Sequence, residues 1–131
     1  MKLIIAGSRN INEYNLINKA IAFAGIDVED ITEIVSGCAK GIDSLAVAWA
    51  KNHGIPVCKM PADWSNLEAD PCLVKTNQYG DYNALAGLVR NKEMGQYADA
   101  LLAIWDGESR GTKQMIEYME ELSKQFWVYE L

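Results

Sequence analysis

The amino-acid sequence predicts an α/β fold, namely a Rossmann-like three-layer α/β/α sandwich around a mostly parallel five-stranded sheet. Short β-rich apolar runs alternate with stretches of helical periodicity along the chain, which is the pattern of repeated βαβ units. The length of 131 residues suits one domain with a single core. No internal repeat, low-complexity tract or linker divides the chain, so residues 1–131 are predicted to form one domain.

The N-terminal part of the chain predicts two strands with a helix between them. The run KLIIA at residues 2–6 predicts a strand that is buried on both faces. Apolar residues then recur at helical spacing from Leu16 to Ala24, and Gly25 ends this helix. The run EIVS at residues 33–36 predicts the second strand.

The middle of the chain continues the same alternation before it breaks off. An apolar stripe predicts a helix from Ile42 to Ala50, and the run IPVCKM at residues 55–60 predicts the third strand. Pro, Asp, Asn, Gly and isolated aromatics then predict a long loop over about residues 61–83. Loops of that length in compact domains are usually functional or mobile. A helix is predicted from there to about Ala98.

The C-terminal part predicts two further strands. The run ALLAIW at residues 100–105 predicts the fourth strand, and FWVYE at residues 126–130 predicts the fifth. The helix between them has an apolar stripe that contains Met115, Ile116 and Met119. Right-handed crossovers lead us to predict the strand order 3-2-1-4-5, with helices on both faces of the sheet.

Composition argues against several classes of function. The net charge is −6 and the sequence pI is near 4.7, which argues against a nucleic-acid partner. No apolar run approaches the roughly 20 residues needed to cross a bilayer, so no membrane partner is expected. The N-terminus has the pattern of a strand rather than a signal peptide.

Cysteine usage indicates a reducing compartment. The three cysteines are an odd number at wide spacing and form neither a disulfide framework nor a zinc pattern, and the chain has one histidine. We therefore expect a cytoplasmic protein without a metal site.

Three loops are predicted to meet at one edge of the sheet. They are GSRN after the first strand, SGCAKGID at residues 36–43 and WDGESRGT at residues 105–112. In such sheets, ligands bind outside the carboxyl ends of the strands where the strand order reverses. Glycine lets the backbone approach a ligand closely, and a helix that starts after such a turn presents N–H groups and a positive dipole end. The loops therefore predict an anion site, above all for phosphate.

The side chains of these loops agree with an anion site, because they supply hydroxyl donors and arginine forks. Asp43 has two interpretations, as a contact to a ribose hydroxyl or as an acid in the first turn of a helix. The ligand-binding residues predicted from the loops are Gly7, Ser8, Arg9, Ser36, Gly37, Gly41, Asp43, Asp106, Gly107, Ser109, Arg110, Gly111 and Thr112.

The chain resembles the YspA-type, cpYpsA-related branch of the SLOG superfamily over nearly its whole length. The segments GSR, VSGCAKGID, PADW, AGLVRNKEM and ADALLAIWDGESRGTKQMI occur in the order seen in that branch. The superfamily of Rossmann-like domains also includes the LOG phosphoribohydrolases and the DprA/Smf proteins. Residues 68–79 look like extra length in a loop that is usually shorter. The resemblance implies a pocket that binds or senses a phosphorylated nucleotide or a ligand derived from one.

LOG enzymes cleave the N-glycosidic bond of nucleoside monophosphates with a helix arginine and a glutamate. The segment RNKEM is similar to the LOG segment that carries the arginine, which implies a ligand role for Arg90 and Asn91; a solvated surface position is the other interpretation. Met115 stands where the LOG pattern has its glutamate. A thioether can neither stabilise a cationic sugar nor activate water, so LOG-type hydrolysis is disfavoured.

Two functions from different classes follow from the sequence. The first is a binding or sensing module for the phosphorylated ligand. The alternative is a nucleotide hydrolase that acts on an N-glycosidic or phosphate bond, with Arg90 and one of Asp43, Asp106 or Glu108 as the catalytic candidates. Whether the protein is an enzyme therefore stays open. A DprA-like role in handling DNA depends on SGCAKGID alone, and the acidic balance of the chain opposes it.

A few other residues have open interpretations. Trp64 and Tyr82 either stack on a base or pack beneath the long loop, and His53 is interpreted as the end of a helix. Cys38 is interpreted as a small residue of a turn. No cofactor other than a nucleotide-type ligand is evident, and a homodimer is an open alternative to a monomer.

Overall fold

The structure, a computed structural model, describes all residues 1–131. Its main element is a five-stranded sheet of order β3-β2-β1-β6-β7, in which every neighbouring pair is parallel. Numbered among themselves, these strands have the predicted order 3-2-1-4-5, so this prediction is confirmed. The strands are β1 (Lys2–Gly7), β2 (Glu33–Ser36), β3 (Val57–Lys59), β6 (Ala100–Trp105) and β7 (Gln125–Glu130).

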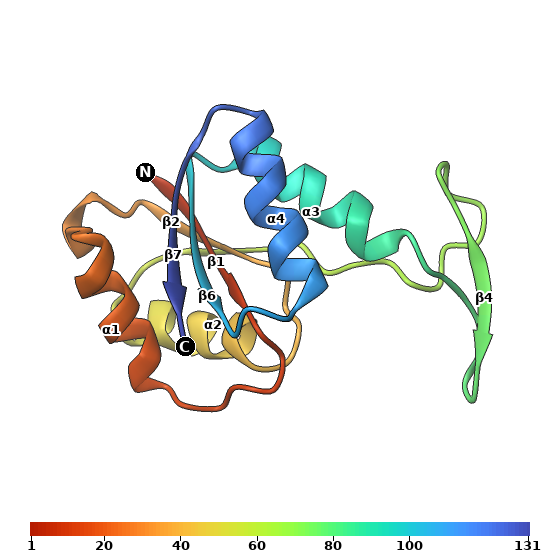
Figure 1. The fold of residues 1–131 in the computed structure, drawn as a ribbon, viewed down its shortest axis with the longest axis horizontal. Coiled ribbons are helices and arrows are strands. Elements are labelled where there is room, and N and C mark those ends of the chain that lie inside the picture. The colour runs from red at the N-terminus through yellow and green to blue at the C-terminus, as the bar shows by residue number, and fades with distance from the viewer.

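Four α-helices connect these strands, and a short 3-10 helix precedes β2. In Figure 1, α1 and α2 lie on one side of the sheet and α3 and α4 lie on the other. None of the helices combines the length and the apolar character that a membrane crossing requires. The helices are α1 (Asn15–Ala24), η1 (Val28–Asp30), α2 (Ile42–Asn52), α3 (Ala86–Tyr97) and α4 (Arg110–Glu121).

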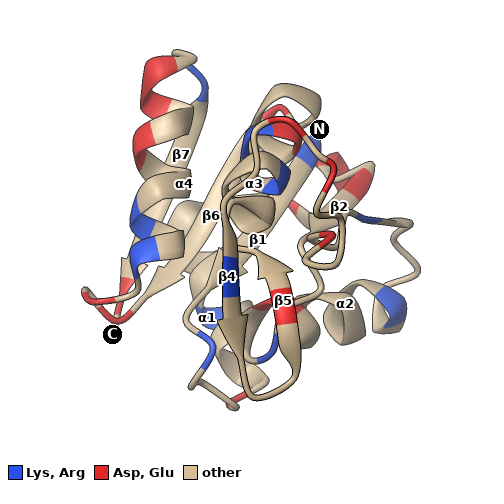
Figure 2. Cartoon of the chain, turned by 90° about the vertical axis from the view of Figure 1, so that its right-hand side faces the viewer, with Lys and Arg blue, Asp and Glu red and all other residues tan.

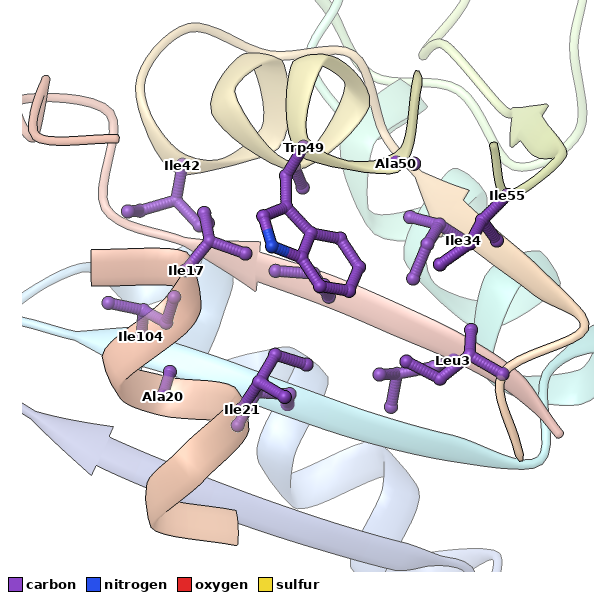
Figure 3. Close-up of a cluster of buried hydrophobic side chains, with 14 of the residues drawn as sticks. Leu3, Ile17, Ala20, Ile21, Ile34, Ile42, Trp49, Ala50, Ile55 and Ile104 are labelled. Atoms are coloured by element: carbon purple, nitrogen blue, oxygen red, sulfur yellow. The ribbon is translucent and has the colours of Figure 1, made fainter. Parts of the chain in front are cut away.

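Alternate residues of β1 belong to different cores. Leu3 and Ile5 are fully buried in a cluster of 16 residues with α1 and α2, and the indole of Trp49 occupies the middle of this cluster (Figure 3). Ile4 and Ala6 belong to a second cluster of nine residues with α3 and α4. This alternation follows from the period of two in a strand, and it explains why β1 is apolar throughout.

The predicted loop over residues 61–83 contains an antiparallel hairpin that the sequence did not predict. Its strands are β4 (Val74–Asn77) and β5 (Gly80–Asn83), which form a separate two-stranded sheet. All four residues of β4 are exposed, and β5 buries only its last residue, Asn83, so neither strand has the apolar alternation that identifies a half-buried strand. The hairpin stands away from the five-stranded sheet, at the N-terminal end of α3 (Figure 1).

The start of α3 also differs from the prediction, because it begins at Ala86 rather than near residue 83. Asn83 is the last residue of β5, and its buried side-chain oxygen accepts hydrogen bonds from the amides of Leu73 at 3.3 Å and Leu85 at 3.0 Å. These bonds hold the backbone around Asn83 in a turn, and the helix starts only after it.

Candidate ligand-binding cleft

The loops after β1, β2 and β6 meet at one edge of the sheet, and Ser8 joins them. The amide of Ser8 donates to the carbonyl of Ile104 at 3.2 Å, and its carbonyl accepts from the amide of Ile42 at 3.3 Å. Its hydroxyl accepts from the amide of Asp106 at 3.2 Å. Ser8 is buried, with 1% of its surface exposed. Ser8 therefore positions the other loops relative to β1.

The loop between β2 and α2 uses many of its polar groups within the protein. The hydroxyl of Ser36 donates to the carbonyl of Asp43 at 3.2 Å and accepts from the amide of Cys38 at 3.1 Å. The amide of Ala39 donates to the carboxylate of Asp43 at 3.3 Å. Several amides of this loop are therefore already occupied, and the loop forms a fixed wall of the site.

Two glycines of this wall permit close approaches. Gly41 has a φ of 76°, and a Cβ at this position would lie 2.5 Å from the carbonyl oxygen of Ser8. At Gly37, a Cβ would lie 2.6 Å from Nη1 of Arg90. Both positions therefore require glycine, one for its backbone conformation and one for the space that the arginine occupies.

The loop between β6 and α4 leaves amides open. The carboxylate of Asp106 accepts from the amides of Glu108 at 2.8 Å and Ser109 at 2.9 Å, and these bonds lower the pKa of Asp106. The next amides, of residues 110–112, make no hydrogen bond within the protein. They lie at the positive end of the α4 dipole, where N–H groups lack intrahelical partners. This turn therefore offers donors to an anion.

Arg90 is a buried cation held by three protein acceptors. It is 9% exposed, and its Nε donates to the side-chain oxygen of Asn91 at 2.9 Å. Its Nη1 donates to the carbonyl oxygens of Gly37 at 2.6 Å and Met60 at 3.4 Å. Its Nη2 makes no hydrogen bond within the protein. The contacts fix the guanidinium and leave one of its nitrogens for a ligand.

Asp43 places a buried carboxyl near this cation. It is 6% exposed, and burial raises its pKa above the ordinary value, although the charge of Arg90 opposes the rise. Burial likewise lowers the pKa of Arg90, and the charge of Asp43 opposes that change. The two groups do not form an ion pair within 4.0 Å. Their charges therefore interact electrostatically without a direct salt bridge.

A cleft of about 170 Å³ opens between the three loops, α3 and α4. The exposed side chain of Arg9 reaches it from the β1 loop and makes no hydrogen bond within the protein. The structure brings eight of the predicted residues together in its lining: Gly7, Arg9, Asp43, Arg90, Asn91, Ser109, Gly111 and Thr112.

The other predicted residues lie around the cleft without lining it, and their contact with a ligand stays a prediction. Buried serines and glycines build the walls, and Asp106 organises the α4 loop. Arg110 and Glu108 are exposed residues of that loop. The residues outside the lining are Ser8, Ser36, Gly37, Gly41, Asp106, Gly107, Glu108 and Arg110.

Apolar residues complete the lining, and most of them were not singled out from the sequence. Ala6, Ala39, Met94 and Met115 line the cleft. Met115 is 1% exposed and belongs to the core cluster under α3 and α4, so its predicted place in the core is confirmed, and one side of it also borders the cleft. Met94 follows Arg90 by four residues, which places both on one face of α3. The four-residue spacing from Arg90 is the sequence feature that could have identified Met94 as a residue of the cleft.

A model of the YspA, cpYpsA-related SLOG family matches residues 1–66, which is half of the 131 residues. The chain belongs to this SLOG family. The matched half includes the loops after β1 and β2, whereas the α4 loop of this SLOG-family chain lies beyond it. The role of the α4 loop therefore depends on its geometry.

The chain is also similar in fold to a solved structure. The X-ray structure of DNA processing protein A (DprA) from Streptococcus pneumoniae superposes with a TM-score of 0.67 at 18% sequence identity. The match covers 97% of this SLOG-family chain and 49% of the DprA chain, so the chain spans about half the length of that protein. At this identity the likeness shows the fold alone. No curated protein matches the chain.

Proposed function

We propose that this SLOG-family protein binds or senses a phosphorylated nucleotide, or a ligand derived from one, in the cleft at the carboxyl edge of the sheet. The observation that carries the proposal is that Gly111 and Thr112, whose amides are open, line one cleft together with Arg9 and Arg90. Helix N-termini and arginine forks are the groups that proteins use to hold phosphate oxygens.

The size of the cleft indicates which part of the ligand it takes. Small-molecule sites usually have volumes of about 300–1,000 Å³. A cleft of about 170 Å³ is smaller than this and suits a phosphate with part of its sugar. The hydroxyl of Thr112, 3.2 Å from that of Ser109, adds a further polar group on the α4 side.

The test is calorimetric titration of the protein with AMP and with ribose 5-phosphate. Arg9→Ala is the informative variant, because the side chain is exposed and makes no hydrogen bond within the protein, so the fold does not depend on it. Arg9→Ala should remove one or two hydrogen bonds between the guanidinium and the phosphate of the ligand. We therefore expect both ligands to bind this variant about 10- to 100-fold more weakly.

The matched control is Lys113→Ala, which removes one positive charge near the same helix end. Lys113 is exposed, and its ion-pair partner is Glu117 at 3.9 Å. Affinity should stay within about twofold in this variant. Arg110→Ala is measured as a further variant, because the sequence predicts that Arg110 contacts the ligand although its side chain does not line the cleft. Full affinity of Arg9→Ala for both ligands would contradict the proposed site.

A second candidate function, hydrolysis of an N-glycosidic bond, is favoured by the position of Asp43. Of the three acidic candidates, it alone lines the cleft; Asp106 accepts hydrogen bonds within the α4 loop, and Glu108 is exposed outside the lining. Water would add to C1′ of the ribose as the bond to the base breaks. Asp43 would accept the proton that the water loses and then release it to solvent, and the departing base would take up a proton from solvent. The raised pKa of Asp43 suits this proton transfer.

This activity is tested by incubating AMP with the protein at equal concentration and measuring released adenine. If the chain is a hydrolase, wild type should release the base and Asp43→Asn should slow the release about 10²- to 10⁴-fold, since general acid–base catalysis contributes that much. AMP binding should survive in the variant. Absence of adenine at this protein concentration would reject the hydrolase and leave the binding function standing.

Location and partners are part of the proposal. All three cysteines are free, which supports the reducing, cytoplasmic location that we propose. Asp and Glu outnumber Lys and Arg by 18 to 12, and in Figure 2 the Lys and Arg segments are spread over several elements, which supports a small-molecule partner rather than a nucleic acid. Self-association stays a prediction.

A further inference from the structure

Trp64 is anchored on one side and open on the other. A Cβ at Gly87 of α3 would lie 2.9 Å from the tip of its ring, and the Tyr82 ring meets it edge-on, with centroids 6.4 Å apart at 67°. The carbonyl of Trp64 accepts from the amide of Asn83. The residue is nevertheless 39% exposed. A fixed indole with open surface is suited to stack on a second planar ring.

A pocket of about 490 Å³ lies between Trp64 and the hairpin, and we call it the hairpin pocket. Tyr79, Tyr82 and Asn77 contribute to its lining, together with Arg9 from the β1 loop. Tyr79 is 88% exposed in the turn between β4 and β5, and its amide is held by the side chain of Asn77 at 2.8 Å. Its ring therefore stands at the pocket with no protein group packed around it.

The hairpin pocket adjoins the cleft, because Arg9 lines both. A hollow of about 410 Å³ shares Trp64 with the hairpin pocket and Arg90 with the cleft. These three neighbouring concavities, which we call the groove, extend from the cleft to the aromatic rings of the hairpin. The cleft carries cations and open amides, and the hairpin pocket carries aromatic faces.

We propose that the hairpin pocket binds the planar base of the ligand, with the base stacked on Trp64 beside Tyr79 while the phosphate lies in the cleft. This inference rests on the proposed function and narrows its ligand to a base-bearing nucleotide rather than a sugar phosphate. Every base has a π-face, so such a pocket recognises the presence of a base more than its identity. On this proposal the hairpin serves ligand binding rather than the packing of the core.

The experiment compares AMP with ribose 5-phosphate, which carries the same phosphate and sugar without the base. Both are titrated calorimetrically into wild type, Trp64→Ala and Tyr79→Ala. We expect AMP to bind wild type more tightly, and Trp64→Ala to weaken AMP about 5- to 150-fold, the effect of losing one stacked base. Ribose 5-phosphate should bind all three proteins equally. Tyr79→Ala cannot unfold the core, because the side chain has no packing partner.

Two controls separate stacking from folding. Trp64→Phe keeps a ring at the site and should recover most of the AMP affinity. Phe23→Ala removes another exposed aromatic side chain, which lies on α1 and lines no part of the groove. This variant should bind AMP and ribose 5-phosphate as tightly as wild type does. AMP should also quench tryptophan fluorescence in wild type and much less in Trp64→Phe.

The outcomes distinguish the two proposals. Equal affinity of wild type for AMP and ribose 5-phosphate, or an equal loss of both in Trp64→Ala, overturns the base subsite and leaves the phosphate cleft intact. Failure of both ligands to bind wild type overturns the cleft and the base subsite together.

Discussion

Asp43 is a buried carboxylic acid that lines the same cleft as Arg90 and the open amides of α4. Burial makes its ionised form costly, because water no longer solvates the charge, and Arg90 compensates only in part. The residue combines a structural role, since it accepts from the Ala39 amide, with a position beside the proposed phosphate. Its protonation therefore links the stability of the fold to pH.

We expect Asp43→Asn to change the pH dependence of stability. The pKa of Asp43 is raised in the folded state above 3.8, so the folded chain binds more protons than the unfolded chain between the two pKa values. Stability from this group is present at low pH and is lost as pH rises through the folded pKa. Asparagine keeps the acceptor for Ala39 and abolishes the titration.

The measurement is urea unfolding of both proteins from pH 4 to pH 8. The free energy of unfolding of Asp43→Asn, minus that of wild type, should increase with pH over the window above 3.8 and then level off. A difference that is constant or decreases with pH would contradict a raised pKa.

At the scale of elements, the position of α3 depends on a contact from outside the helix. Nζ of Lys124, in the connection to β7, donates to the carbonyl oxygens of Gly95 at 2.8 Å, Gln96 at 2.9 Å and Ala98 at 2.8 Å. These acceptors lie at the C-terminal end of α3, where carbonyls lack intrahelical partners and the dipole favours a cation. The contact holds the helix that carries Arg90.

We expect Lys124→Met to destabilise the protein by about 1.5–3 kcal/mol, the contribution of hydrogen bonds to a charged group. Methionine preserves the apolar stem and removes the ammonium. The free energy of unfolding in urea is the measurement. Lys113→Met, which breaks an exposed ion pair at 3.9 Å, should change it by less than about 1 kcal/mol. Equal effects of the two substitutions would show that the Lys124 contact contributes no more than a surface pair.

The hairpin is the element that sequence periodicity missed, for a physical reason. Its strands pair with each other and bury almost nothing, so no apolar pattern was required of them. A two-stranded hairpin alone is marginally stable in water. The bonds of Asn83 to the chain on both sides, and the contact of Trp64 with α3, connect this element to the domain.

At the scale of the whole molecule, two turns of similar sequence have different structures. Both follow a strand, contain two glycines and precede a helix. In the first, Ser36 and Asp43 occupy the amides of Cys38 and Ala39, and Ser8 occupies that of Ile42; in the second, Asp106 occupies the amides of Glu108 and Ser109, and those of residues 110–112 have no protein acceptor. A glycine pattern predicts where backbone amides are accessible, and only the surrounding acceptors determine which of them are free.

The parallel sheet, its strand order and the meeting of three loops at one edge follow from the sequence, because burial on both faces of a strand leaves a continuous apolar run and crossovers have one hand. Long-range neighbours are a different matter. Arg90 donates a hydrogen bond to Gly37 across 53 positions of the chain, and Arg9 lines one pocket with Trp64 and the hairpin, an arrangement that no local pattern encodes. Such contacts arise when helices and loops pack, and packing is decided by the shapes of side chains that are distant in sequence.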